Sequence, residues 1–269
     1  MMKFILRTFL ACFLLWSGMN SAHGQEVRLN AAVADSAGFM AVGEVFAWLD
    51  AEGNVIDTLS LPVPMVSAAG LEGWVFALDT VGREIFMIHP TGVIVAHIEP
   101  PLNGCLRAIA SDEVTLWAVT DAGEILRSDN GFMWTIKDFN EEYGGFYPKM
   151  DFRAVAAGGG SVMIAGLTED GRPAAFTSSG GGVWSERILN YTKQNRPLYL
   201  HAVPSALAFD AVQDSFYLLC NDGVMFRLPS CSHCNSIEYY PADTLYARVP
   251  LGFDVLVLGS DGFKILEKP

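Results

Sequence analysis

A recurring strand start constrains the fold of this chain more than any other feature of its sequence. Six segments rich in small residues each lead into a β-rich run, which in most of them ends in a turn, at spacings of about 35 to 50 residues: 31–34, 66–69, 107–110, 153–156, 205–208 and 247–250. Further short β-rich runs follow, separated by Gly, Asp, Asn and Pro, and helical periodicity is almost absent. Units of this kind are typical of β-propeller blades.

The number of units predicts an all-β fold, a six-bladed β-propeller of four-stranded antiparallel blades. Five units are complete, and the sixth, residues 246–266, ends after three strands. Residues 26–29 would supply the missing outer strand, because joining both termini in one blade removes an exposed sheet edge. Five blades, with an irregular first unit, is the alternative.

The first 24 residues have the organisation of a secretory signal peptide. Lys3 and Arg7 precede a short apolar run, and small residues precede a cleavage site before Gln25. We therefore expect residues 25–269 to form a single β-propeller domain that is periplasmic or secreted. The apolar run is too short to span a bilayer, so we expect no membrane insertion after signal cleavage. Acylation of Cys12 is an alternative, although the apolar run continues past this cysteine.

The charge of the chain limits its partners. It has 30 acidic and 17 basic residues, which gives a formal net charge of -13. Such a surface repels nucleic acid and anionic lipid.

Cys231 and Cys234 form a Cys-x-x-Cys pair where the fifth unit should carry its second turn. For an exported chain this pattern favours a structural disulfide, while a metal half-site and a redox pair are the alternatives. Cys220 could instead pair with one of the two, and Cys105 could remain free. A metal site would need further ligands nearby, and phosphate-binding, zinc-protease and calcium motifs are missing from the sequence, so we expect neither metal nor cofactor.

One turn sequence appears twice, between two apolar runs. Gly accepts positive φ and Ser, Asp or Asn bond to nearby backbone, which suits a hairpin turn. The residues that we expect to have a structural role there are Ser128, Asp129, Gly131 and Trp134 in the first copy, and Ser178, Gly181 and Trp184 in the second.

The first copy, 128–134, resembles the Asp-box of Ycf48-like and sialidase-type (BNR) propellers, in a shortened form. The resemblance covers residues 106–189 well, whereas residues 74–95 look more like a repeat of the NHL type. In these families the box is a structural turn at the blade periphery. The resemblance therefore implies a turn-stabilising role for Asp129 and no catalytic role.

Basic residues recur at the heads of the small-residue strands. Arg107 and Arg153 have the same place in consecutive units, His201 is a candidate for the next unit, and Arg248 for the last. Because innermost strands surround the ring axis, these side chains could converge and bind a carboxylate or phosphate. The alternative is that each arginine pairs with an acidic residue of a neighbouring blade.

Two loops between units contain aromatic residues beside Gly and acidic residues. Tyr143 and Tyr147, in residues 140–149, could stack against a sugar, and residues 190–197 are a second candidate. Solvated connections are the alternative in both places.

These observations favour an exported, non-enzymatic propeller that binds or scaffolds a protein or glycan partner through one face of the ring. The arginines also invite comparison with sialidase-like glycoside hydrolases, which is the alternative function. That chemistry needs a Tyr nucleophile with a Glu partner and an Asp acid, and no spacing selects such a set from Tyr143, Tyr147, Glu238, Tyr239 and Tyr240. We therefore expect no catalytic residues.

Overall fold

The computed structural model describes most of the chain between residues 29 and 230 and parts of the remainder. The described residues are 12–13, 29–35, 38–51, 53–187, 189, 191–193, 196–198, 203–211, 213–221, 225–230, 238–240, 247–251, 254–259 and 262–267. Side chains are described for residues 29–34, 38–51, 53–187, 189, 203–211, 213–221 and 226–230.

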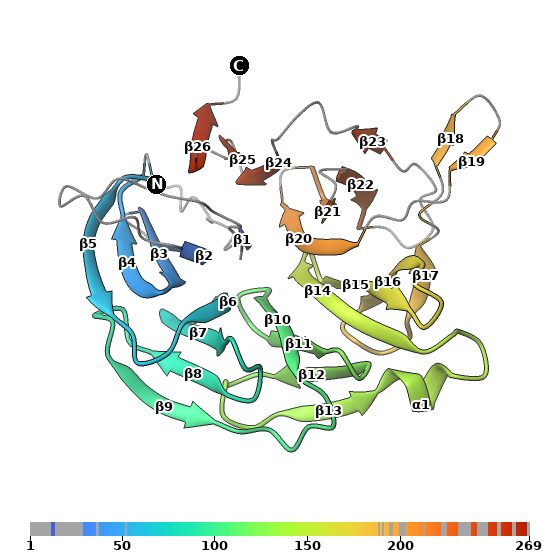
Figure 1. The fold of residues 1–269 in the computed structure, drawn as a ribbon, viewed down its shortest axis with the longest axis horizontal. Coiled ribbons are helices and arrows are strands. Elements are labelled where there is room, and N and C mark those ends of the chain that lie inside the picture. The colour runs from blue at the N-terminus through green and yellow to red at the C-terminus, as the bar shows by residue number, and fades with distance from the viewer. Residues whose placement is uncertain are drawn as a thin grey trace, which may run out of the picture.

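Five blades of four antiparallel strands stand around a common axis, each with its first strand toward that axis (Figure 1). The sheet of blade 1 has one further short strand, β1, which is described below. Blade 1 consists of β2 (Leu29–Asp35), β3 (Gly38–Gly43), β4 (Val45–Leu49) and β5 (Val55–Ser60). Blade 2 consists of β6 (Met65–Leu71), β7 (Trp74–Asp79), β8 (Ile85–Ile88) and β9 (Ile94–Ile98). Blade 3 consists of β10 (Leu106–Ser111), β11 (Leu116–Thr120), β12 (Glu124–Ser128) and β13 (Thr135–Asp138). Blade 4 consists of β14 (Met150–Gly158), β15 (Ser161–Thr168), β16 (Pro173–Ser179) and β17 (Ser185–Arg187). Blade 5 consists of β20 (Pro204–Asp210), β21 (Ser215–Cys220), β22 (Met225–Pro229) and β23 (Glu238–Tyr240).

The remaining elements lie outside this pattern. They are the short strand β1 (Cys12–Phe13), which pairs with β2; the helix α1 (Phe139–Tyr143), between blades 3 and 4; the hairpin β18 (Tyr191–Lys193) and β19 (Arg196–Leu198); and a three-stranded sheet of β24 (Ala247–Leu251), β25 (Asp254–Gly259) and β26 (Gly262–Glu267). In Figure 1 the three-stranded sheet lies between blade 5 and blade 1.

The prediction of six blades closed by the N-terminal strand is wrong. The structure has five four-stranded blades, and the described residues at the N-terminus add no strand to the sheet of β24, β25 and β26. Leu29, which was expected in the closing strand, is fully buried and pairs with Gly43 inside blade 1. The alternative of five blades is correct, although the incomplete unit is the last one and not the first.

Small residues in the innermost strands allow the blades to approach one another closely. Buried alanines occur in β2, β6, β10, β14 and β20. Three apolar clusters each fill the space between two consecutive blades, from blade 1 to blade 4, and a fourth joins blades 4, 5 and 1. Blade-to-blade contact therefore forms the core, and it fixes where each innermost strand presents its side chains.

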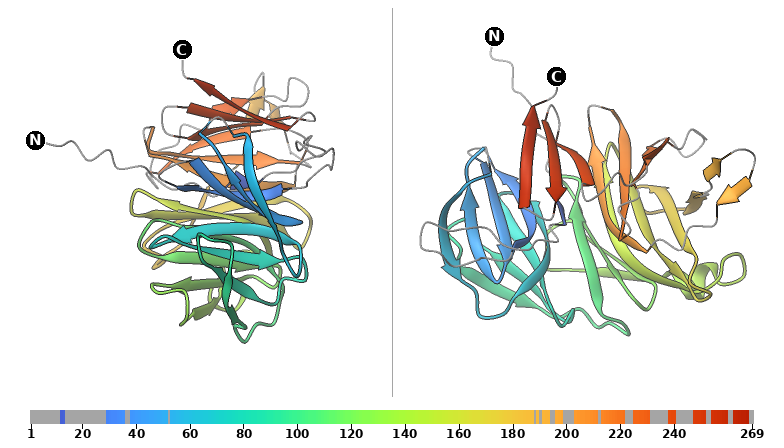
Figure 2. Two further views of the ribbon diagram at one scale, coloured as in Figure 1. Left: turned by 90° about the vertical axis from the view of Figure 1, so that its left-hand side faces the viewer. Right: turned by 45° about the horizontal axis from the view of Figure 1, so that its top comes forward.

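The ring is a disc of twisted sheets when it is turned on its side (Figure 2). Each blade has four antiparallel strands, so the chain returns to the same face of the disc at the end of every blade. All five innermost strands consequently start at one face and end at the other. No helix within the described part of the chain is both long and apolar enough to cross a membrane.

Candidate functional site

Every innermost strand has a β-bulge near its start. The pairing with the second strand shifts between Leu29 and Ala31, and at the equivalent step in each of the other blades. The five residues at the shifts are Asn30, Val66, Arg107, Arg153 and Ser205. A bulge bends the strand and changes the direction of the side chain at that position. Arg107 and Arg153 are therefore structurally equivalent, as their places in the sequence suggested.

The bulged residue is also the most exposed one in its part of each strand. In all five blades it is partly or fully exposed, while both of its neighbours are buried. Because the innermost strands start at one face of the disc, these five residues, here called the bulge ring, lie around the axis at that face. The sequence pattern had Val66 and Ser205 at the heads of their segments but gave them no role, because neither carries a charge. It missed Asn30, which directly precedes the first segment.

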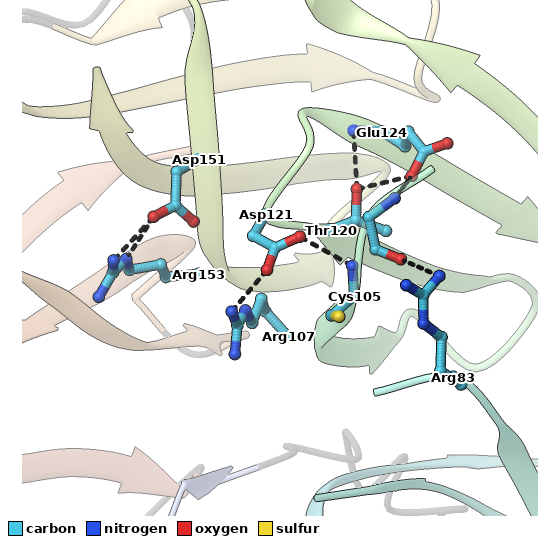
Figure 3. Close-up of polar contacts among 9 residues, drawn as sticks. Arg83, Cys105, Arg107, Thr120, Asp121, Glu124, Asp151 and Arg153 are labelled. Carbon is cyan, nitrogen blue, oxygen red and sulfur yellow. Dashed lines mark hydrogen bonds and ion pairs between the residues drawn. The ribbon is translucent and has the colours of Figure 1, made fainter. Parts of the chain in front are cut away.

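Arg107 and Arg153 form ion pairs inside their own blades (Figure 3). Nη2 of Arg107 lies 2.5 Å from Oδ2 of Asp121, which is in the turn between β11 and β12. Nε and Nη2 of Arg153 donate to Oδ2 of Asp151, at 3.1 and 2.7 Å. No described side chain gives either arginine a carboxylate partner in a neighbouring blade. The alternative in which these arginines join blades to one another therefore finds no support among the described contacts.

Both arginines keep donors for a ligand. Their side chains are 50% and 41% exposed, and Arg107 uses one N–H group in its described contacts while Arg153 uses two. The other two polar members of the bulge ring already form hydrogen bonds. The side-chain amide of Asn30 donates to the carbonyl oxygen of Met65, and the hydroxyl of Ser205 donates to the carbonyl oxygen of Leu219. The exposed donors are thus concentrated in blades 3 and 4.

Two carboxylates fix the loop that leads into β10. Glu124 is buried, and its carboxylate accepts the backbone N–H groups of Asn103 and Gly104 at 2.9 and 3.0 Å. Oδ1 of Asp121 accepts the N–H group of Cys105 at 2.7 Å. Three consecutive amides thus point at carboxylates, an arrangement that proteins use to bind anions.

The same network connects this loop to its surroundings (Figure 3). The hydroxyl of Thr120 donates to Glu124, and Arg83 of blade 2 donates to the carbonyl oxygen of Gly104. Since Asp121 bonds both this loop and Arg107, it places the guanidinium group of Arg107 relative to the fixed backbone. The sequence singles out neither Glu124 nor Asp121, because an acidic residue beside a turn is ordinarily solvated.

The other predicted site residues are less completely placed. His201, Cys231 and Cys234 lie outside the described residues, so the disulfide stays a prediction. Arg248 is in a regular ladder opposite Val257, without the bulge of the blades, and its side chain is not described. Cys105 has no disulfide partner within the described part of the chain.

Tyr143 and Tyr147 pack against the core between blades 3 and 4. The Tyr143 ring is stacked on Phe139 at 4.8 Å, and the Tyr147 ring meets Phe176 edge to face at 4.9 Å. The hydroxyl of Tyr143 accepts the N–H group of Trp184 at 3.3 Å. These contacts engage both rings with neighbouring side chains, and a role in sugar binding stays a prediction.

The turn at 128–134 is held by its own side chains. Oγ of Ser128 accepts the N–H group of Gly131, and Oδ1 of Asn130 accepts those of Phe132 and Met133, all at 2.9 Å. The indole of Trp134 donates to the carbonyl oxygen of Gly131. Asn130 thus makes the backbone contacts that the resemblance implied for Asp129.

Asp129 points elsewhere, since its carboxylate accepts from the hydroxyl of Thr115 and from Arg127. In the second copy of the turn, Gly181 has positive φ like Gly131, and Trp184 is buried. The hydroxyl of Ser178, however, is buried without a hydrogen-bond partner among the described residues.

Comparison with solved structures identifies the fold as a β-propeller and goes no further. A virginiamycin B lyase from Staphylococcus aureus is similar over 96% of this chain and 87% of its own, with a TM-score of 0.64 and 16% identity. The crystal structure of a nidogen/laminin complex contains a chain with a TM-score of 0.59 and 15% identity, over 82% of this chain and 84% of that one. YCF48 from Cyanidioschyzon merolae matches 98% of this chain and 86% of its own, with a TM-score of 0.52 and 11% identity.

No protein-family model matches the chain, and neither does any curated protein. The similar structures include a Ycf48 protein, but an Asp-box family in particular is not established by them.

The described side chains contain no cluster suited to a metal ion. No group of three or more His, Cys, Asp and Glu side chains in the described part of the chain is arranged to hold a metal ion. The side chains of Glu238, Tyr239 and Tyr240 are not described. What the described site offers chemically is a pair of exposed guanidinium groups on a fixed backbone.

Proposed function

We propose that this β-propeller is an exported, non-enzymatic binding scaffold that holds an anionic group of a protein or glycan partner against Arg107 and Arg153. One observation carries the proposal: two neighbouring innermost strands each present an arginine at a bulge, half-exposed and with unused donors. Arginine binds carboxylates and phosphates through a planar fork of N–H groups, which suits this arrangement.

The acidic partners of the two arginines do not prevent such binding. Exposed ion pairs contribute only about 0 to 1 kcal/mol, so a ligand can share or replace them at little cost. Asp121 and Asp151 also hold the guanidinium groups in place before binding, which reduces the ordering that a ligand would have to impose. In a chain with a net charge of -13, an accessible pair of cations is a local exception that would attract an anion.

Structures with a similar fold support a protein partner, because some of them are parts of protein complexes. Similar propellers occur in the nidogen/laminin complex and in the mitotic checkpoint complex. A glycan partner would have to offer a carboxylate or sulfate to the same two arginines.

The test uses two kinds of probe, a polyglutamate peptide and an array of acidic glycans, with the full-length mature chain. We expect one of them to bind, and binding to be lost in the Arg107→Ala/Arg153→Ala variant. Arg172→Ala is the matched control, because Arg172 also pairs with a nearby carboxylate but is in the β15–β16 turn and not at a bulge of an innermost strand. Equal binding by wild type and double variant would refute the proposal.

A glycoside hydrolase would be separated from a scaffold by its turnover. We expect no hydrolysis when the purified chain is screened against chromogenic sialosides and common glycosides. Turnover that is lost in the double variant would establish the enzyme and reject the non-enzymatic scaffold.

A further inference from the structure

A second surface lies at the opposite face of the disc from the bulge ring. The innermost strands end there, and so do the third strands of each blade, because successive strands are antiparallel. The hairpin tip between β10 and β11 and the turns after β12 and β16 are therefore at this face.

Four large apolar side chains are exposed on these tips and turns. They are Val114 (71% exposed), Phe132 (55%), Met133 (75%) and Val183 (77%), here called the turn patch. Single exposed apolar residues are normal on a protein surface, but neighbouring ones mark interaction sites. Whether the four are neighbours decides what they mean.

Direct contacts connect the segments that carry the turn patch. The hydroxyl of Thr115, next to Val114, donates to Asp129 in the turn of Phe132 and Met133. The turn that carries Val183 contacts blade 3 through Gly181. The α-carbon of Gly181 lies against the ring of Trp117, and the carbonyl oxygen of Gly181 accepts a hydrogen bond from Lys137. The patch thus extends over adjoining parts of blades 3 and 4.

The turn that holds Phe132 and Met133 is rigid. Asn130 accepts the backbone N–H groups of both residues at 2.9 Å, and Ser128 accepts that of Gly131. The two side chains are therefore presented to solvent by a turn with satisfied hydrogen bonds, which lowers the entropy that a partner must remove on binding.

Acidic groups border the patch. Asp112 and Glu113 immediately precede Val114, and the Asp129 side chain is 66% exposed. Nearby Arg127 is already engaged, because it pairs with Asp129 and lies over the Trp117 ring at 5.5 Å. This border disfavours anionic lipid and complements a cationic protein segment.

We infer that the turn patch is a docking surface for a protein segment that combines apolar side chains with lysine or arginine. The apolar side chains cover Phe132, Met133 and Val183, and the cations meet Asp112, Glu113 and Asp129. The bulge ring and the turn patch then give the disc two faces for partners of opposite charge. This surface is independent of the arginine site, so failure of one leaves the other standing.

The experiment is a selection from a random-peptide display library against the immobilised full-length chain, with removal of peptides that also bind Phe132→Ser/Met133→Ser/Val183→Ser. We expect the remaining peptides to be enriched in apolar residues beside Lys and Arg, and to bind the triple variant at least about tenfold more weakly than wild type. Ile56→Ser is the matched control, since Ile56 is an exposed apolar residue on the outer strand of blade 1, and it should leave affinity unchanged.

Two further measurements complete the test. Thermal unfolding of the triple variant should match wild type, because all three side chains are exposed. Vesicles of phosphatidylglycerol should not bind. No enrichment over the triple variant, enrichment of acidic peptides, or vesicle binding that depends on the patch would each overturn the inference.

Discussion

Ser128 and Ser178 have the same position in two copies of one turn, but their hydroxyls have different surroundings. Ser128 accepts the N–H group of Gly131, whereas Ser178 is buried without a partner among the described residues. The sequence shows that the second copy is degenerate, yet not that its serine has lost this contact. The sequence also does not show that Asn130 makes the backbone hydrogen bonds implied for Asp129. Asp and Asn can both accept such bonds, and which of the two does so depends on the direction of each side chain in the folded turn.

The two serines give a matched pair of substitutions. Ser128→Ala should lower the free energy of unfolding by about 1 kcal/mol, because it leaves a turn amide without its acceptor. Ser178→Ala should have little effect or stabilise slightly, because it removes a buried hydroxyl without a partner. Chemical denaturation of both variants measures the difference, and an equal loss in both would contradict the described turn.

Asp170 provides a test through its pKa. The hydroxyl of Thr168 and the Arg172 guanidinium both bond its carboxylate, and they hold the pKa of Asp170 below its ordinary value. A folded-state pKa below the unfolded one adds stability above the unfolded pKa, and this is lost as the pH falls through the folded pKa. Titration followed by NMR should show the pKa of Asp170 rising in Thr168→Val. An unchanged pKa would show that the hydroxyl does not bond the carboxylate.

At the scale of elements, the turns after the third strands of blades 3 and 4 pack against the preceding blade. Gly131 lies against the ring of Phe76 in blade 2, and Gly181 against that of Trp117 in blade 3. The sequence predicted these turns from Gly and Ser, and it placed Arg107 and Arg153 at equivalent strand starts. It did not reveal the packing between blades, because that packing joins residues that are distant in the sequence. Nor did it reveal the five bulges, because they depend on the exact register between the two strands of a hairpin.

Two glycines with positive φ distinguish packing from backbone conformation. An added methyl group would lie 2.2 Å from the Phe76 ring at Gly131 and would meet nothing within 4 Å at Gly180. Gly180→Ala should therefore cost about 1 kcal/mol from φ alone, and Gly131→Ala about 3 kcal/mol or more because the blades must also move apart. Thermal unfolding compares them. Equal costs would mean that the turn at Gly131 does not pack between blades.

At the scale of the whole molecule, the sequence predicted a propeller but gave the wrong number of blades. The last unit has the same strand and turn pattern as the others. That pattern alone does not tell whether its three strands gain a fourth strand from elsewhere in the chain or remain a three-stranded sheet. Closure depends on which strand pairs with the last sheet. Leu29 was assigned to that role but belongs to blade 1, where its burial and its pairing with Gly43 place it.

Export is a property of the whole chain and stays a proposal from the sequence. If residues 1–24 form a signal peptide, the mature protein should begin at Gln25 and be recovered from the periplasm or the medium. Mass spectrometry of the N-terminus after cell fractionation measures this. An N-terminus at Met1 in the cytoplasm would contradict export.

The proposed function depends most directly on whether the bulge ring binds an anion. Isothermal titration with the anionic probe that binds best, at low salt, should show at least about a tenfold loss of affinity in Arg107→Ala/Arg153→Ala, because two charge-assisted contacts are removed. Arg172→Ala should bind like wild type. If the double variant keeps its fold and wild-type affinity, or if Arg172→Ala loses as much, the anion does not bind at the bulge ring and the proposed function is wrong.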